Sequence, residues 1–428
     1  MITKTQDQKI ILALFFLLAL TKFILIFYLG DAKDALLNEG ESNEWGTLYL
    51  SLKNFGEMSW FSNETIRFPN AFMPPLYVYF IYMHSLVSEN YLVKIILFSQ
   101  MFISILTSFF FFKLCLKKLS YKESILAFLI FSFYPLNLYG STQISSVTLV
   151  LFIYVIFLYF VITKKNIFLI CAIASLGIMA RGEFKFLYLI FLIYFAINKT
   201  FSLKKIISGL LLTICILSPQ IIKNYVTFER IFITHSSGYV LWRGNNELSN
   251  VTSIKADQII GSIERSILKP NLKINYDFIN APQQFKDIGN ELNSIKNNYK
   301  YDVERDDIFK RYVLKNLVTD PFRYIELYIK KIISFIFFNL QSDYPNYYHP
   351  FSIIPEIILS IGAVLGFVLS IQNYKKYIVI YIYLFFMIAI YSLLLILPRY
   401  KLFLLPGYVI FFSILIFKIK NYFKKFLA

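Results

Sequence analysis

Seven of the 26 acidic side chains lie in one segment, residues 31–74, of a chain that is basic as a whole. They are Asp31, Asp34, Glu39, Glu41, Glu44, Glu57 and Glu64. Glu44 opens a helix-like run that ends at Gly56, and the later Pro74-Pro75 pair interrupts any helix and stiffens the chain that follows. A carboxylate held by such a framework could act as a general base. For any single acid, the general preference of charged residues for an exposed loop is the simpler explanation.

Two arginines stand at the ends of apolar runs, where they could bind an anion. Arg181 and Glu183 separate two short apolar runs, and charges at such depth tend to mark ion pairs or substrate paths. Arg399 follows the apolar run 377–397, and a guanidinium can hold two phosphate oxygens at once, which lysine cannot. The alternatives are an Arg–Glu pair that caps a helical hairpin and a snorkelling anchor at Arg399.

The elements that position these groups are expected to be membrane spans. Hydrophobic residues make up 57% of the chain and charged residues 16%, which is far from the composition of a soluble globular protein. A span needs roughly 20 apolar residues. The predicted spans are residues 10–30, 91–116, 123–140, 146–163, 166–181, 183–198, 205–222, 352–371, 377–397 and 401–417. The sequence therefore predicts an all-α polytopic membrane protein with about ten spans.

Short clusters of lysine at the span ends predict the topology. They are Lys4/Lys9, Lys117/Lys118/Lys122, Lys164/Lys165, Lys199/Lys204/Lys205, Lys375/Lys376, Lys418/Lys420 and Lys424/Lys425. Short loops that carry such clusters stay in the cytoplasm. In a soluble protein the net charge of +17 would suggest nucleic acid. Here the dispersal of the lysines indicates membrane anchoring, and no nucleic-acid partner is expected.

One short apolar segment, residues 76–87, decides on which side each loop lies. Its length of about twelve residues favours an interfacial or re-entrant element over a span. Without that crossing, both termini and every lysine cluster are cytoplasmic. Loop 31–90 and a polar segment, residues 223–351, then lie outside. The expected parts are a transmembrane module (1–222), an extracytoplasmic domain (223–351) and a C-terminal transmembrane module (352–428).

The stretch 321–340 at the end of this outer segment is amphipathic, with Arg323, Lys330 and Lys331 on an apolar background. It is expected to be a helix lying in the membrane interface, with a crossing helix as the alternative. The three cysteines, Cys115, Cys171 and Cys215, fall in apolar runs without metal spacing and are expected to be small core residues. No His/Asp spacing argues for a metal.

The order of these groups resembles the GT-C superfamily of polytopic glycosyltransferases, and within it the group of protein O-mannosyltransferases and lipid A aminoarabinose transferases. The matching positions are Glu44, Ser51-Leu52, Gly56, Pro74-Pro75-Leu76-Tyr77, Arg181, Glu183, Pro219, Asn224-Tyr225, Gly244-Asn245, Arg399-Tyr400 and Pro406. The resemblance covers residues 10–417. It implies a GT-C-like helical bundle with a small extracytoplasmic domain.

The resemblance also implies a function, namely transfer of one sugar from a polyprenyl-phosphate carrier to an acceptor on the extracytoplasmic face. The acceptor could be a glycan, a lipid or a protein, and single-step displacement would invert the anomeric centre. The implied substrate-binding residues are Arg399, Tyr400, Arg181, Glu183, Tyr77 and Asn245. No cofactor is required, because cationic side chains can neutralise the phosphate. The expected location is a bacterial inner (plasma) membrane, with the active site facing outside.

The general base is the least settled role. Many relatives carry an Asp-Glu pair after the first span; here that pair is absent, so Glu44 is the aligned acid and Asp31, Asp34 and Glu41 compete with it. The loop 139–146 has no carboxylate where some relatives place a second acid. A polysaccharide polymerase or ligase is one alternative function. A flippase or transporter of lipid-linked sugars is another, although it would place charges at the bilayer midplane.

Overall fold

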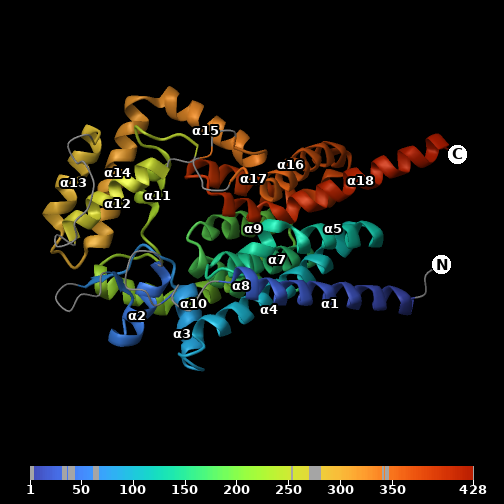
Figure 1. Ribbon diagram of the computed structural model, residues 1–428, viewed down its shortest axis with the longest axis horizontal. Helices are drawn as coiled ribbons and strands as arrows, with labels where there is room; N and C mark the ends of the chain where they lie inside the picture. The colour runs from blue at the N-terminus through green and yellow to red at the C-terminus, as the bar shows by residue number, and fades with distance from the viewer. Residues whose placement is uncertain are drawn as a thin grey trace.

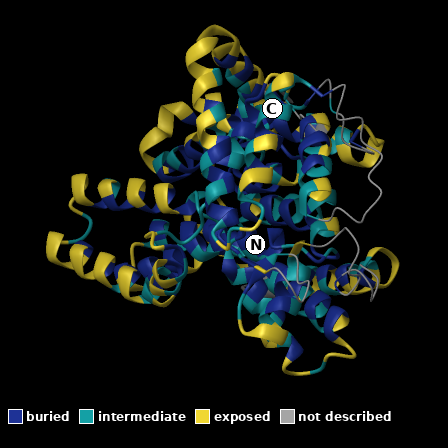
Figure 2. Ribbon diagram, turned by 90° about the vertical axis from the view of Figure 1, so that its left-hand side faces the viewer, coloured by how far each residue is buried: buried dark blue, intermediate teal, exposed yellow. Residues whose placement is uncertain are grey.

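A computed structural model describes residues 4–30, 36, 44–60, 67–251, 254–268, 281–339, 342 and 347–427. The molecule has two ends, visible in Figure 1: a bundle of long helices on the right and a group of shorter helices on the left. Both termini lie at the far end of the bundle, away from the shorter helices. Figure 2, seen from the end with the shorter helices, shows that the buried residues form a central core.

The helices of the bundle follow the predicted apolar segments. They are α1 (Lys4–Leu29), α4 (Leu92–Lys118), α5 (Tyr121–Phe133), α6 (Pro135–Gly140), α7 (Val147–Thr163), α8 (Ile167–Ala180), α9 (Phe184–Ile197), α10 (Leu203–Phe228), α16 (Pro350–Ser370), α17 (Tyr374–Leu393) and α18 (Leu405–Leu427). The short 3₁₀ helices η3 (Ile371–Asn373) and η4 (Pro398–Phe403) flank α17. The predicted span 123–140 is divided, because Tyr134 adopts an extended conformation before Pro135.

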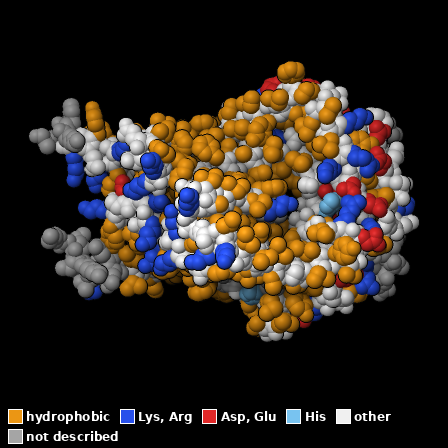
Figure 3. Space-filling view, turned by 180° about the vertical axis from the view of Figure 1, so that it is seen from behind, with side chains coloured by type: hydrophobic (Ala, Val, Ile, Leu, Met, Phe, Trp, Pro, Cys, Tyr) orange, Lys and Arg blue, Asp and Glu red, His pale blue; other side chains and the backbone are white. Residues whose placement is uncertain are grey.

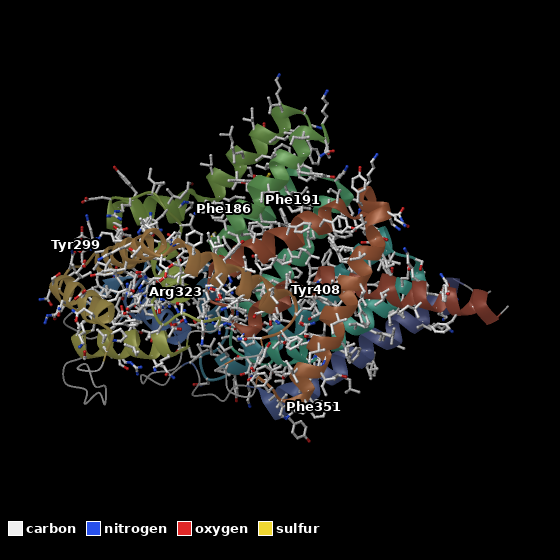
Figure 4. All side chains as sticks on the ribbon, turned by 90° about the horizontal axis from the view of Figure 1, so that it is seen from above. Phe186, Phe191, Tyr299, Arg323, Phe351 and Tyr408 are labelled. Atoms are coloured by element: carbon white, nitrogen blue, oxygen red, sulfur yellow. The ribbon has the colours of Figure 1, made fainter. Side chains whose placement is uncertain are left out.

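Four helical stretches of the described chain are long and apolar enough to cross a membrane: Lys9–Leu29, Leu92–Lys118, Leu203–Phe228 and Pro350–Leu393. Helices α7, α8 and α9 are apolar but shorter. Two phenylalanines of α9 are labelled in Figure 4: Phe191 is fully buried, whereas Phe186 is 47% exposed. The protein is thus a helical membrane protein, and the count of ten spans stays a prediction.

Two glycines on α16 allow this helix to pack closely against α18. A Cβ at Gly366 of α16 would stand only 1.9 Å from the carbonyl oxygen of Phe411 on α18. Four residues earlier, Gly362 lies against the ring of Phe412. Small residues at such spacing let transmembrane helices approach closely. Cys115 and Cys171 are buried as expected, but Cys215 is exposed on α10, so its prediction as a core residue is wrong.

The first loop folds against the end of the bundle opposite the termini. It contains α2 (Glu44–Phe55), the antiparallel pair β1 (Ser59–Trp60) and β2 (Phe68–Pro69), and α3 (Pro75–Ser85). With 11 residues, α3 is roughly 16 Å long, about half the thickness of a hydrocarbon core. It has the length expected of an element that does not cross.

The second group of shorter helices has a core of its own. It consists of α11 (Ser237–Gly244), α12 (Ile254–Leu268), α13 (Gln283–Ile295) and α14 (Tyr301–Thr319). The next helix, α15 (Pro321–Ile336), packs against α17, and its Phe335 lies in the core of the bundle. Trp242, Phe285 and Phe309 lie at the centre of this core. Phe68 of the first loop belongs to the same cluster, so the loop and the helices form one unit.

Charge is distributed unequally between the two ends (Figure 3). Lysine and arginine gather at the end that holds both termini, hydrophobic side chains form the middle, and acidic and basic residues mix at the other end. Lys118 Nζ donates to the carbonyl oxygen of Lys376 at 2.7 Å, which joins two of the predicted clusters. This distribution is the one that the positive-inside rule describes.

Candidate functional site

Two short connections, one between α8 and α9 and one between α17 and α18, carry the predicted arginines. Arg181 ends α8 in an extended conformation, and Glu183 precedes the first residue of α9. Pro398 stands at the first position of η4, where its missing N–H costs nothing, and Arg399 and Tyr400 follow it in the first turn of that helix. The structure brings both connections together.

The Arg181 guanidinium is in contact with aromatic rings and only weakly paired. It lies 4.8 Å from the ring centre of Tyr400 and 5.3 Å from that of Phe403. Its Nη1 is 3.7 Å from Glu183 Oε1, and this oxygen also accepts a 2.7 Å hydrogen bond from the Tyr391 hydroxyl. The Nε of Arg181 is buried without a hydrogen-bond partner in the described part of the chain. A buried donor of this kind is unusual and can bind an anion.

The electrostatics at Tyr400 show that the site favours negative charge. Burial alone would raise the pKa of the Tyr400 phenol, but the positive charges of Arg181 and Arg399 and a hydrogen bond from Arg181 hold that pKa below its ordinary value. The charge of Arg243 acts in the same direction. Three arginines from different elements, called here the arginine cluster, therefore act on one phenol: Arg181 and Arg399 lie against its ring, and Arg243 acts through its charge.

Arg243 is the member of the arginine cluster that sequence reasoning missed. It lies on α11, with its guanidinium 5.5 Å from the ring centre of Tyr239, and forms a bidentate ion pair with Asp257. Its position directly before Gly244-Asn245 was the available signal. Arg399 is exposed and lies 5.8 Å from the Tyr400 ring centre.

Asn245 lies beside the cluster with its side-chain amide already engaged. Its Nδ2 donates to the carbonyl oxygens of Leu241 and Leu393, each at 2.8 Å. Its Oδ1 accepts from Lys331 Nζ at 3.2 Å. This arrangement ties α11 to α17 and α15. The role of Asn245 in substrate binding stays a prediction.

Lys331 was expected on the polar side of an interfacial helix, and that placement is wrong. It is fully buried, and its ammonium donates to the carbonyl oxygen of Gly244 at 2.6 Å as well as to Asn245. Arg323 and Lys330 on the same helix are exposed. A second buried lysine, Lys22 in α1, donates to Ser141 Oγ at 3.0 Å. The sequence analysis did not single out Lys22, and it did not expect Lys331 to be buried.

Tyr77 belongs to a different cluster of the structure. It is 1% exposed, its hydroxyl donates to Gln100 Oε1 at 2.6 Å, and its ring lies edge-on to Trp45 at 4.9 Å. These contacts fix α3 against α4 and α2. A substrate contact by Tyr77 stays a prediction.

Among the described residues, no contact joins a predicted base to the arginine cluster. Glu44 is exposed at the first position of α2. Asp31, Asp34 and Glu41 lie outside the described residues.

The first loop is nevertheless connected to the cluster through the segment between α10 and α11. His235 N donates to the carbonyl oxygen of Ala71 at 2.7 Å. A Cβ at Gly182 would stand 2.6 Å from Thr234 Oγ1, so this segment also touches the turn that carries Arg181. In the described part of the chain, no three His, Cys, Asp or Glu side chains are grouped as a metal site would require.

Comparison with known proteins identifies the fold. No protein-family model and no curated protein matches the sequence. Among solved structures, the archaeal oligosaccharyltransferase AglB from Archaeoglobus fulgidus, in complex with an inhibitory peptide and a dolichol-phosphate, matches with a TM-score of 0.54 and 12% identity. The match covers 97% of this chain and 51% of AglB, so the chain spans about half the length of that protein. This likeness shows that the chain shares the fold of the matched part of AglB.

Proposed function

We propose that this protein is a glycosyltransferase that moves one sugar from a polyprenyl-phosphate carrier to an acceptor on the extracytoplasmic face of the membrane. The observation that carries the proposal is the arginine cluster around Tyr400 at the end of the bundle opposite the termini. A lipid phosphate at the membrane boundary is the anion that such a cluster would meet. The fold shared with AglB, which was solved with a dolichol-phosphate, supports the same reading.

The cluster would bind the phosphate more strongly as the reaction proceeds. Arg181 has a free Nε–H, and Arg399 has no ion pair in the described part of the chain. When the bond between the anomeric carbon and the phosphate oxygen breaks, the electron pair remains on the phosphate and its negative charge grows. Fixed guanidinium groups then stabilise the transition state more than the bound donor.

The acceptor supplies the nucleophile. A carboxylate of the first loop takes the proton of an acceptor hydroxyl. The oxygen of that hydroxyl then forms the new bond to the anomeric carbon as the phosphate leaves. Attack from the face opposite the phosphate inverts the anomeric centre. Glu44 is the first candidate for the base, with Asp31, Asp34 and Glu41 as competitors. In this scheme the arginines neutralise the phosphate, so no metal or other cofactor is needed.

Two alternatives make different demands on the structure. A transporter of lipid-linked sugars would need its charges near the bilayer midplane, whereas the arginine cluster lies at the ends of helices. A polysaccharide polymerase or ligase would use the same arginines, with a glycan chain in place of a single sugar.

Reconstitution of the purified protein with polyprenyl-phosphate sugars tests the proposal. We expect release of polyprenyl phosphate that depends on an added glycan, lipid or protein acceptor, and loss of both donor binding and turnover in Arg181→Ala. Arg311→Ala is the matched control, because Arg311 is an exposed arginine paired with Glu291 on α13. Donor binding without turnover for any sugar or acceptor, together with movement of the donor across the bilayer, would establish a transporter instead.

A further inference from the structure

One turn of α14, residues 302–306, contacts both parts of the proposed site. Asp302 Oδ2 accepts three hydrogen bonds from the first loop: from Ala71 N at 2.7 Å, Phe72 N at 2.9 Å and Trp60 Nε1 at 3.1 Å. Asp302 is 4% exposed. Three donors on one buried carboxylate oxygen hold the backbone of the loop in a single position, because charge-assisted bonds of this kind are among the strongest in proteins.

The residue one turn further along α14 holds the helix that carries Arg243. Asp306 accepts from Gly238 N at 3.0 Å through Oδ2 and from Tyr239 N at 2.7 Å through Oδ1. These are free N–H groups of the first turn of α11, where a carboxylate is favoured. Asp306 is fully buried. Four residues after Tyr239, on the same face of α11, comes Arg243.

Between the two acids, Arg305 joins the loop to α11 directly. Its guanidinium lies 3.9 Å from the ring centre of Tyr239 and 5.7 Å from that of Phe72, and it is paired with Glu264. The rings of Phe72 and Tyr239 also meet edge-on at 5.5 Å. Asp302 and Asp306 are four residues apart and so lie on one face of the helix.

We infer that residues 302–306 of α14 form a clamp that sets the distance between the first loop and the arginine cluster, with Asp302 and Asp306 as positioning residues. This inference rests on the proposed function for its kinetic consequence, and on the contacts alone for its structural one. Asp302 fixes the segment that follows the candidate base, and Asp306 fixes Arg243. The clamp thus determines whether an acceptor activated by the loop meets a donor held by the arginines.

The two positions predict different kinetic defects. Asp302→Asn keeps the shape of the side chain but loses the charge that holds three donors, so the first loop, which carries the candidate base, shifts. We expect kcat to fall by about 10- to 100-fold, with little change in the donor KM. Asp306→Asn loosens the start of α11 and moves Arg243, so the donor KM rises several-fold. A merely structural role predicts less folded protein in both variants and normal constants for the remainder.

A distance measurement tests the clamp independently of activity. Spin labels are placed at Phe55→Cys, at the end of α2, and at Glu247→Cys, after α11; both positions are exposed. The native Cys115, Cys171 and Cys215 are replaced first. We expect a narrow distance distribution in the parent and in the control Glu326→Gln, an exposed acid of the same domain. The distribution should broaden in Asp302→Asn and in Asp306→Asn.

The results separate the clamp from the proposed function. Equally narrow distributions in all variants, or equal broadening in the control, would overturn the clamp. Broadening confined to the two clamp variants supports it, even if the parent turns over no polyprenyl-phosphate sugar. If the parent turns over no polyprenyl-phosphate sugar, the proposed function fails and the clamp remains. Broadening together with the split between kcat and donor KM supports both.

Discussion

At the scale of single residues, the arginine cluster is short of negative charge. One oxygen of Glu183 faces both Arg181 and the Tyr391 hydroxyl, and among the described residues only Arg243 has a closely bound carboxylate, that of Asp257. A guanidinium that is partly buried without full compensation is costly, and such groups occur where a ligand supplies the missing charge. The site is therefore prepared for an anion.

Arg399 gives the sharpest test of this interpretation. Arg399→Lys keeps the charge but loses the two-pronged contact, and we expect kcat to fall by roughly 10²–10³-fold, as for the loss of one oxyanion donor. Arg399→Ala should be worse and should also weaken donor binding. Rates are normalised to folded enzyme, with Arg311→Lys as the control. A normal kcat in Arg399→Lys would remove Arg399 from the phosphate site and leave it as an anchor.

The base is tested by isosteric substitution of each candidate. We expect Glu44→Gln to abolish turnover while the protein still folds and binds donor, because an amide cannot take the acceptor proton. Asp31→Asn, Asp34→Asn and Glu41→Gln are measured in parallel. If Glu44→Gln retains more than a few per cent of activity and Asp34→Asn does not, Asp34 becomes the base.

At the scale of elements, a buried ion pair holds η4, and with it Arg399 and Tyr400. Lys401 forms a salt bridge with Glu356 of α16 and donates to the carbonyl oxygen of Phe337 at 2.9 Å. Glu356 also accepts from the Tyr347 hydroxyl at 2.9 Å. All of these contacts converge on the residue next to Tyr400, so the pair fixes the connection between α17 and α18.

Removal of one partner should therefore cost more than removal of both. We expect Lys401→Met or Glu356→Gln alone to lower the free energy of unfolding by about 3–5 kcal/mol, because a buried charge is left uncompensated. The double variant should recover much of that loss. Thermal unfolding in detergent measures all three against Lys330→Met, in which an exposed i,i+4 pair is removed. Additive losses in the double variant would contradict the coupling.

Much of the helical architecture could be predicted because apolar runs and lysine clusters are local signals. The sequence analysis predicted one span over residues 123–140 and missed its division at Tyr134, although Pro135 was a local signal for it. Arg181 and Arg399 stood out against an apolar background, whereas Arg243 did not, since an arginine in a polar segment is ordinary. Only its place beside Tyr400, far away in the sequence, gives it a role. Asp302 and Asp306 were invisible for the same reason.

At the scale of the whole molecule, the position of both termini at one end requires an even number of crossings. The basic residues gather at that same end, and the first loop and α11–α14 lie at the other (Figures 1 and 3). The proposed reaction on the outer face depends on which end is which. The positive-inside rule predicts that the lysine-rich end lies in the cytoplasm.

Cysteine accessibility in intact cells decides the orientation. In a background without native cysteines, we expect Asn250→Cys, in the outer domain, to react with a membrane-impermeant maleimide without permeabilisation. Lys122→Cys, in the first turn of α5 and part of the cluster Lys117/Lys118/Lys122, should react only once the inner face is opened, because a short connection that carries such a cluster resists translocation. Ser62, an equivalent outer position, lies outside the described residues. The reverse pattern would place the arginine cluster at the cytoplasmic surface, and transfer on the outer face would then be impossible.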